Sequence, residues 1–545
     1  MIKRLKLPIG IQTFETLRTE GYVYVDKTKH LINMIDSGQI YFLARPRRFG
    51  KSLTVSTFDA LFSGKKDLFK GLYAESFLNR PDFRPSPVIR LDMSTITTHE
   101  GLEVMKESML RMTRNVARNL NVEFSDTQIS GDLLGDLIEA TTKKYGQKVV
   151  ILLDEYDKPY TDFVNDPEMA EKVRDVLRSY YVQIKAKDEY IRFTFITGIS
   201  KFARFGVFST LNTPLDISMM PKYAEICGYT EEEIIRYFPD YLDETADDMG
   251  ISLTELMEKM RYYYNGFAFD SGAKIRLYNP YSTLTFFERK EFLNYWVNTG
   301  RPKFIADYMK NRKLTVEQFR NFPVSRNFVN NPGDMDTTPP EGFLYQSGYL
   351  TLRQGKIQDL SLDYPNTEVY NAMSELVTQS MLQYNDESYN QCQTDLLSGL
   401  ITKNKKKIID AFNRLLASIP YDDYLGAAKQ GLSYVDIEIK PQEWLYRASI
   451  LSFLQGCGVV VDAEFSPFEG GRGMLIEGRP DFVIAYRGYV WVIEIKVAYE
   501  GENAEQKAEE AYRQIIDKNY AVPYPNAICL GLGIDNYARQ ITACR

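Results

Sequence analysis

The residues from Ala44 to Ser52, ARPRRFGKS, have the types and spacing of a loop that binds phosphate. An apolar run (39–44) precedes them and helical sequence (53–62) follows, which is the strand, loop and helix order that a P-loop requires. In such a loop, backbone N–H groups and the helix N-terminus face the phosphates, and a lysine reaches the terminal ones. The residues expected to contact a nucleotide are Arg45, Arg48, Phe49, Gly50, Lys51, Ser52 and Leu53.

The fit to the phosphate-loop pattern is incomplete at one position. Gly50, Lys51 and Ser52 match its G-K-[ST] end, with Ser52 as the expected Mg²⁺ ligand, whereas Arg45 occupies the position of the first glycine. Because a chance GKS beside basic residues is common, the prediction of a nucleotide site needs a second motif.

A second acidic motif strengthens the prediction. The run KVVILLDEYDKP (148–159) places five apolar residues before Asp154, where a Walker B carboxylate would support Mg²⁺. Glu155 follows, where an additional-strand ATPase keeps its water-activating base. The run PVIRLDM (87–93) is expected to supply the extra strand of that class. Thr197, at the end of the run 190–197, is expected to sense the γ-phosphate, with Ser200 close behind.

Two further cations could complete this site. Arg204 or Lys201 could act as a charge-stabilising finger, and either could equally be an ordinary surface residue. The remaining alternative is an α/β domain without nucleotide whose carboxylates lie on the surface.

A second candidate site lies near the C-terminus. Asp481 precedes the run VWVIEIKV, in which Glu494 and Lys496 share one face of a strand. A hairpin would bring Asp481 across from Glu494, where two carboxylates can hold a divalent cation. Lys496 can then position water or stabilise charge on phosphorus. Relief of repulsion between the acids should leave their amide variants no less stable without metal.

More acids could converge on this pair. Glu443 lies on a helix ahead of the strands, and Glu464 ends the strand before the hairpin; both are candidate metal ligands. Gln514 and Tyr520 follow and could contact a nucleic-acid backbone. The alternative is a plain hairpin with charges on its solvent face.

The elements that would position these residues are those of an α/β protein. Short apolar strands alternate with amphipathic helices up to about residue 215, which predicts a mostly parallel sheet covered by helices. Helical, tyrosine-rich sequence follows, beginning with a capping box at Thr230 and Glu233. The last 110 or so residues read as a separate αβββαβ unit.

Composition excludes several other classes. The chain of 545 residues has a formal net charge of −7, so it is not a protein that coats nucleic acid over its whole surface, although one basic groove remains open. Two histidines exclude three-histidine zinc sites, and five scattered cysteines without a C-x-x-C motif suit a reducing compartment. No apolar run reaches the length of a membrane span, and we expect a cytoplasmic protein.

With both sites identified, the chain resembles the bacterial AAA-ATPase-like proteins that carry a C-terminal PD-(D/E)XK nuclease domain. The resemblance runs nearly end to end. The motifs that carry it are Tyr24-Val-Asp-Lys-Thr28, 45–52, Leu153-Asp-Glu-Tyr-Asp157, Thr197-Gly-Ile-Ser200, Tyr263-Tyr-Asn-Gly-Phe267, Tyr278-Asn-Pro280, Tyr295-Trp296, Thr299-Gly300, Gly348-Tyr-Leu-Thr351, Pro480-Asp481 and Glu494-Ile-Lys496.

The resemblance implies three domains: a P-loop domain over 1–225, a mostly helical region over 226–425 and a restriction-endonuclease-like domain over 426–545. It also implies that Arg45 belongs to the family pattern, that Asp481 and Glu494 hold metal, and that Lys496 supports catalysis. Glu443 matches the acid of the leading helix, and Gln514 a position that is often polar.

The leading hypothesis is an ATP-dependent or ATP-regulated nuclease that uses ATP and Mg²⁺. The alternative is a signalling or scaffold ATPase whose nuclease-like domain binds nucleic acid or partners without cutting, and a third reading has both sites silent. The expected partner is nucleic acid, with DNA as the first candidate, at the C-terminal domain; no membrane is expected, and a homo-oligomer is compatible with the sequence. The sequence does not distinguish DNA from RNA.

Overall fold

A computed structural model describes most of the chain. The described residues are 4–123, 132–163, 166–199, 214–298, 319–326, 328, 340–355, 360–381, 386–417, 441–457, 459–463 and 480–545. They form two compact units, one of Met1–Thr299 with Asn321–Glu368 and one of Gly300–Arg320 with Val369–Arg545. The three-domain division with boundaries near 225 and 425 stays a prediction.

The first unit is built around a five-stranded sheet in which every pairing is parallel. Its order is β2-β3-β4-β1-β5. The strands are β1 (Ile40–Ala44), β2 (Val88–Asp92), β3 (Val149–Asp154), β4 (Ile191–Gly198) and β5 (Leu215–Asp216). Because all five run the same way, the loop after β1 and the acids after β3 meet at one edge, as predicted.

The sheet corrects one detail of the prediction. The run 87–93 was expected to supply the extra strand of the additional-strand class, but β2 lies at the edge of the sheet, beyond β3. The strand inserted between the loop strand β1 and the acidic strand β3 is β4. Thr197 at the end of β4 therefore lies directly between the two motifs.

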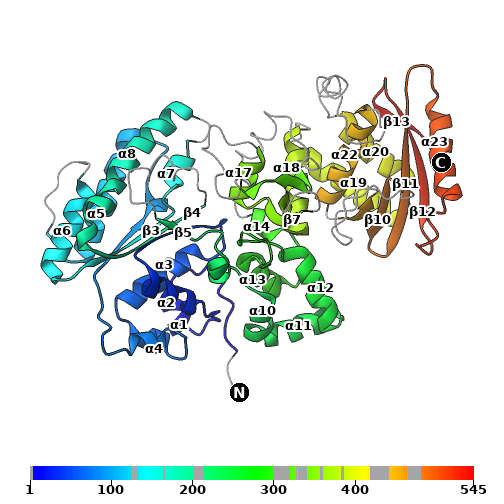
Figure 1. The fold of residues 1–545 in the computed structure, drawn as a ribbon. Helices are drawn as coiled ribbons and strands as arrows, with labels where there is room; N and C mark the ends of the chain where they lie inside the picture. Colours follow the sequence, from blue (N-terminus) through cyan, green and yellow to red (C-terminus); the bar gives the residue numbers. More distant parts are fainter. Residues whose placement is uncertain are drawn as a thin grey trace. The chain divides into compact units, whose positions relative to one another are not determined.

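Helices cover both faces of this sheet (Figure 1). On one side lie α1 (Phe14–Thr19), α2 (Thr28–Ser37) and α3 (Lys51–Phe62), and on the other α5 (Leu102–Asn119), α6 (Leu133–Tyr145) and α8 (Pro167–Ala186). Short helices α4 (Glu75–Leu78) and α7 (Lys158–Thr161) complete this part. Every residue of β3 is buried, as expected for a central parallel strand covered on both faces.

The middle of the chain is helical, as predicted. Its helices are α10 (Glu231–Tyr237), α11 (Pro239–Met249), α12 (Leu253–Tyr264), α13 (Pro280–Arg289), α14 (Tyr295–Asn298) and α17 (Pro340–Ser347). Thr230 and Glu233 form the predicted capping box at the start of α10. A small antiparallel sheet in the order β6-β8-β7 was not predicted, because its strands, β6 (Phe322–Val324), β7 (Thr351–Gln354) and β8 (Leu360–Asp363), are only three or four residues long.

The C-terminal part has a mixed sheet in the order β13-β12-β11-β10-β9. Only β11 and β12 run parallel; the other neighbours are antiparallel. The elements are α18 (Thr367–Met381), α19 (Asp386–Thr402), α20 (Lys405–Ala417), α22 (Pro441–Gly456), β9 (Val460–Ala463), β10 (Phe482–Tyr486), β11 (Tyr489–Ala498), α23 (Ala504–Asp517), β12 (Ile528–Asp535) and β13 (Gln540–Cys544). The predicted αβββαβ order from α22 to β12 is confirmed, and β13 adds an edge strand that was not predicted.

Close packing of α23 buries one face of this sheet. A Cβ on Gly533 would lie 2.0 Å from the carbonyl oxygen of Ala504, and one on Gly531 would lie 2.5 Å from that of Ala508. Only glycine therefore allows the helix to approach β12 this closely. Residues of α19, α20 and α22 bury the opposite face, which includes Ile493 and Ile495. Both faces are covered, so the hairpin acids do not lie on a solvent face.

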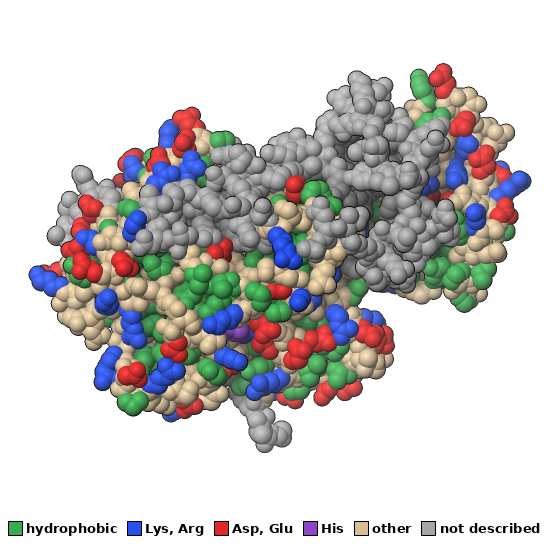
Figure 2. Space-filling view, viewed as in Figure 1, with side chains coloured by type: hydrophobic (Ala, Val, Ile, Leu, Met, Phe, Trp, Pro, Cys, Tyr) green, Lys and Arg blue, Asp and Glu red, His purple; other side chains and the backbone are tan. Residues whose placement is uncertain are grey.

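The surface carries charges of both signs. In Figure 2, Lys and Arg side chains are interspersed with Asp and Glu over the visible described surface of the P-loop part. Within the described ranges, no helix is both long and apolar enough to cross a bilayer.

Candidate functional sites

The phosphate loop is shaped by two residues with left-handed backbone. Gly50, with φ of 101°, caps the N-terminus of α3, and Arg48 has φ of 66°. Lys51 is buried, and its ammonium donates to the carbonyls of Arg45 at 3.0 Å and Pro46 at 3.1 Å. The lysine is thus folded into the loop and held by neutral groups, and Ser52 follows it in the first turn of the helix.

Arg45 takes the place of the missing glycine without facing the loop interior. Its buried guanidinium donates to the carbonyls of Ala44, Ser218, Tyr223 and Ala224 and lies 4.2 Å from the centre of the Phe269 ring. Burial lowers the pKa of Arg45 to about 10. The side chain joins the loop to the segment 218–224, and a contact between Arg45 and nucleotide stays a prediction.

The other loop residues differ in exposure. The Phe49 ring is buried between Phe267 and Phe269, with centroid distances of 4.8 and 5.2 Å, so it anchors the loop. The Arg48 guanidinium lies 5.2 Å from the ring centre of Tyr281. Leu53 is half-buried at the start of α3.

The acids after β3 lie beside the predicted polar sensor. The Thr197 hydroxyl donates to Oδ1 of the buried Asp154 at 2.5 Å. Glu155 follows with a left-handed φ of 50°, and burial raises the pKa of its carboxyl while Lys51 opposes that shift. Burial also lowers the pKa of Lys51, against the attraction of Glu155, Asp154 and Asp157. The structure therefore brings Lys51, Asp154, Glu155 and Thr197 together at one edge of the sheet.

Asp157 was quoted in the sequence motif but given no role. Its two carboxylate oxygens each lie 3.2 Å from the backbone N–H of Ile199, just after β4. It thereby ties the turn after β3 to the end of β4. The repetition of Asp in LDEYD was the signal that could have identified it.

The loop is also supported by Trp296, which sequence reasoning placed only in a motif. The indole N–H donates to the carbonyl of Arg47 at 2.9 Å. The backbone N–H of Trp296 donates to Glu368 at 2.6 Å, and the Ser282 hydroxyl donates to the same carboxyl at 2.7 Å. Burial raises the pKa of Glu368 to about 7.

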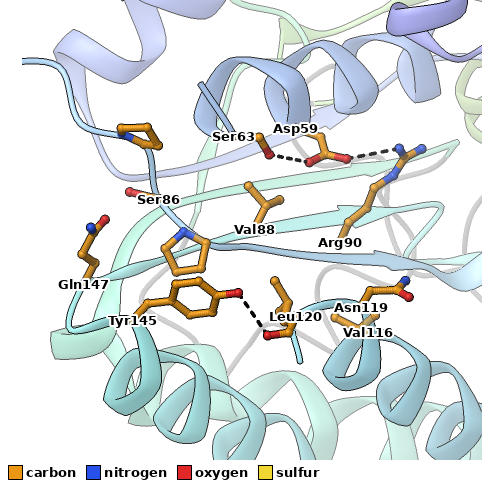
Figure 3. Close-up of a pocket in the computed structure, with 12 residues that line it drawn as sticks. Asp59, Ser63, Ser86, Val88, Arg90, Val116, Asn119, Leu120, Tyr145 and Gln147 are labelled. Carbon is orange, nitrogen blue, oxygen red and sulfur yellow. Dashed lines mark hydrogen bonds and ion pairs between the residues drawn. The ribbon is translucent and has the colours of Figure 1, made fainter. Parts of the chain in front are cut away.

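A cavity of about 640 Å³ lies elsewhere in this unit, around the first residues of β2 (Figure 3). Its charged lining is an ion pair between Arg90 and Asp59 at 3.7 Å. On the other side of the β2 ribbon, the Tyr145 hydroxyl donates to the Leu120 carbonyl at 3.0 Å. It contains none of the predicted site residues, because those lie at the opposite, carboxyl ends of the strands.

In the C-terminal unit, Asp481 and Glu494 face each other as predicted. The register pairs Phe482 with Ile493, so Asp481 lies opposite Glu494. Asp481 N–H donates to Glu494 Oε2 at 3.0 Å, and Ile495 N–H donates to Asp481 Oδ2 at 2.7 Å. Both acids are buried, and burial together with the nearby Asp481 charge raises the pKa of Glu494 to about 8. The half-buried Lys496 acts in the opposite direction.

Arg447 is the charged neighbour that sequence reasoning missed. It lies on α22, and its Nη1 is 2.9 Å from Asp481 Oδ1. Its side chain is 14% exposed and that of Asp481 is 2% exposed, so the ion pair is largely shielded from water. In the sequence, only the position of Arg447 four residues after Glu443, on one predicted helix, could have indicated that it lies near these acids.

Several predicted residues are placed differently or not described. Gln514 on α23 lies 3.5 Å from the Tyr520 hydroxyl, and Tyr520 is buried against Val483 and Val492. Only the backbone of Glu443 is described, within α22. Glu464, Ser200, Lys201, Arg204, Thr299 and Gly300 lie outside the described residues. Within the described part, no three His, Cys, Asp or Glu side chains converge on a metal position.

Known proteins resemble the chain in both parts. Residues 8–208 match a family described as "Predicted AAA-ATPase", and residues 473–539 match a family of the PD-(D/E)XK nuclease superfamily. An Azotobacter chroococcum mcd 1 protein, "Uncharacterized protein in vnfD 5'region", is 32% identical over 537 residues, which are 96% of this chain and 94% of the relative. A crystal structure of Cdc6p from Pyrobaculum aerophilum matches 67% of this chain and 98% of its own length at 11% identity, with a TM-score of 0.23.

These matches confirm the resemblance drawn from the motifs. The relative spans nearly the whole chain, and the two family matches cover the phosphate loop and the hairpin acids. The chain belongs to the family of AAA-ATPase-like proteins that carry a PD-(D/E)XK nuclease superfamily domain in their C-terminal part.

Proposed function

We propose that this protein binds and hydrolyses ATP in its N-terminal unit and cleaves nucleic-acid phosphodiesters with Mg²⁺ in its C-terminal unit. One observation carries the proposal: each unit gathers carboxylates and a lysine at a buried position of its sheet. Lys51 meets Asp154 and Glu155 in the first, and Lys496 follows Asp481 and Glu494 in the second.

The residues of the first site fit Mg²⁺ and ATP. Lys51 and the N-terminus of α3 supply positive charge and N–H donors for phosphates. Asp154, oriented by Thr197, and the Ser52 hydroxyl are oxygen ligands of the kind Mg²⁺ prefers. Burial raises the pKa of Glu155, which suits a group that must accept a proton from water.

The residues of the second site fit a hard divalent cation. Two buried carboxylates that face each other repel when both are ionised, and a cation between them relieves that repulsion. When bound there, Mg²⁺ would supply Lewis-acid activation of the phosphodiester. Lys496 holds positive charge next to Glu494, where it can stabilise charge that develops on phosphorus.

The test is plasmid cleavage by the purified full chain, with and without Mg²⁺ and ATP. We expect Mg²⁺-dependent nicking that disappears in Asp481→Asn, and an ATP effect that disappears in Lys51→Ala. Lys66→Ala is the matched control, because Lys66 is exposed beyond the end of α3. Full nicking by Asp481→Asn would contradict the nuclease assignment.

One observation favours the alternative of a domain that binds without cutting. The Asp481 carboxylate already has a cationic partner in Arg447 at 2.9 Å. In the same plasmid assay, binding of DNA without nicking in Mg²⁺ or Mn²⁺ would support that alternative.

A further inference from the structure

The ion pair between Arg447 and Asp481 occupies the oxygen that a metal would use. Arg447 Nη1 lies 2.9 Å from Asp481 Oδ1, and Ile495 N–H donates to Oδ2 at 2.7 Å. Both oxygens of Asp481 are therefore already bonded to protein groups. A metal ion that binds Asp481 directly has to share or replace one of these bonds, and only the side-chain bond can move without distorting β11.

Cations already balance or outnumber the carboxylates around this oxygen without metal. Asp481 and, once it ionises, Glu494 supply negative charge, and Arg447 and Lys496 both act on Glu494 as positive charges. A divalent cation added to this buried set would leave an excess of at least two positive charges, next to a guanidinium that repels it. The site becomes favourable for metal only when one cation leaves or an anion arrives.

A nucleic-acid phosphate supplies both changes. The planar guanidinium of arginine binds phosphate oxygens in the same two-pronged way as carboxylate oxygens, so Arg447 can exchange one partner for the other. The phosphate also brings the negative charge that the metal needs.

Resting on the proposed nuclease function, we propose that Arg447 is a positioning residue that restrains metal binding until DNA is present. In the free protein its guanidinium holds Asp481 Oδ1. When DNA binds, the guanidinium moves to a backbone phosphate and Oδ1 becomes available to the metal. Metal and DNA then bind cooperatively, and the free protein is protected from loading the metal alone.

The experiment is calorimetric titration of the full chain with Mn²⁺, alone and with a short DNA duplex that has cleavage-resistant phosphorothioate linkages. Binding at this site is obtained by subtracting the Mn²⁺ titration of Asp481→Asn from that of wild type. This subtraction removes the contribution of Mn²⁺ bound elsewhere on the protein. We expect Arg447→Gln to bind Mn²⁺ about tenfold to a hundredfold more tightly than wild type without DNA. This is the size of change that mutating a partner of a metal ligand typically causes, here as a gain because the group removed is a competing cation. The duplex should tighten Mn²⁺ binding in wild type and not in Arg447→Gln.

Two variants separate charge from structure. Arg447→Lys keeps the positive charge, so Mn²⁺ binding without DNA should stay as weak as in wild type. Arg414→Gln removes another arginine of the same unit, paired with Asp395 at 2.7 Å, and should leave Mn²⁺ binding unchanged.

The outcomes distinguish this inference from the proposed function. Equal Mn²⁺ affinity in Arg447→Gln and wild type, or equal wild-type affinity with and without the duplex, would overturn the role of Arg447. The second comparison uses only wild-type protein, so it can overturn the role of Arg447 even where Arg447→Gln does not fold. If Asp481→Asn binds Mn²⁺ as wild type does, the metal site itself is wrong and the proposed function fails with it.

Discussion

Both sites combine buried carboxylates with a lysine, but their charged groups have different kinds of partner. In the N-terminal unit, Lys51 is held by two neutral backbone carbonyls, and the carboxylates of Asp154 and Glu155 act on it without a direct ion pair in the described contacts. In the C-terminal unit, Asp481 is held by the full countercharge of Arg447. In the function proposed above, ATP would replace neutral carbonyls without separating charges, whereas a metal ion would first have to break an ion pair. On this proposal the first site is prepared for its ligand, and the second is restrained.

The largest effect should come from the site without an ion pair. Lys51→Ala should reduce ATP hydrolysis to background and weaken nucleotide binding, because the charge directed at the terminal phosphates is lost. Glu155→Gln should keep binding and lose hydrolysis, since only the proton acceptor is removed. Phosphate release and binding of a fluorescent ATP analogue measure the two effects. Equal turnover in wild type and both variants would end the assignment of this site.

The next effect concerns the lysine of the restrained site. Lys496→Ala should bind Mn²⁺ at least as tightly as wild type, because one cation leaves the site. It should raise the barrier to phosphodiester cleavage by an amount on the order of 3 kcal/mol, the usual effect of losing one group that stabilises transition-state charge. Single-turnover cleavage at saturating Mn²⁺ measures the loss. An unchanged rate would show that Lys496 only balances charge in the resting protein.

The third prediction compares how the amide variants of Asp481 and Glu494 change the stability of the metal-free protein. Asp481→Asn should destabilise the metal-free protein by about 1.5–3 kcal/mol, the contribution of a hydrogen bond to a charged group, because Arg447 keeps its charge and loses the Asp481 carboxylate. Glu494→Gln should be neutral or slightly stabilising, since repulsion from Asp481 disappears. Thermal unfolding in EDTA compares them. The expectation from sequence that both variants are no less stable is therefore kept only for Glu494.

A pH series sharpens this contrast. The pKa of Glu494 is raised in the folded state to about 8, so ionising it favours unfolding. Its stabilising contribution is complete below its ordinary pKa near 4.5 and is lost as pH rises through the folded value. Wild type should lose stability relative to Glu494→Gln by up to about 1 kcal/mol per pH unit in that window. If the free energies of unfolding of the two proteins change with pH in the same way from about pH 5 to pH 8, this expectation is contradicted.

The smallest effect tests the support of the phosphate loop. Trp296→Phe removes the hydrogen bond to the Arg47 carbonyl but keeps an aromatic ring, so stability should fall by about 1 kcal/mol and nucleotide affinity by a few-fold. Trp491→Phe, which removes an equivalent indole hydrogen bond to the Leu400 carbonyl at 3.2 Å in the C-terminal unit, is the matched control and should leave nucleotide affinity unchanged. A loss as large as that of Lys51→Ala would mean that the loop collapses without Trp296.

Local pattern predicted the parts of both sites that are encoded by neighbouring residues. The pairing of Asp481 with Glu494 followed from the hairpin, because Arg487 and Gly488, both with positive φ, form a two-residue turn that fixes the register. Likewise, the strand-loop-helix order around Lys51 placed the lysine at the carboxyl edge of the sheet.

Long-range packing decided what the sequence did not show. The position of β2 at the sheet edge depends on how the parallel connections cross the sheet, which strand patterns alone leave open. Arg447 reaches Asp481 from a helix 34 residues earlier in the chain, and its direction depends on how α22 packs. Trp296 reaches the phosphate loop from 249 residues away.

Arg45 has a consequence for how such a chain can evolve or be recombined. Its guanidinium donates to carbonyls 173 to 179 residues further along, at Ser218, Tyr223 and Ala224. The loop therefore depends on a distant segment of the chain and cannot be transferred to another protein by itself. Grafting a conventional glycine-first loop into this scaffold would leave those carbonyls without their donor, and grafting this loop elsewhere would bury an arginine without acceptors. In relatives, position 45 and the backbone path of 218–224 should therefore change together.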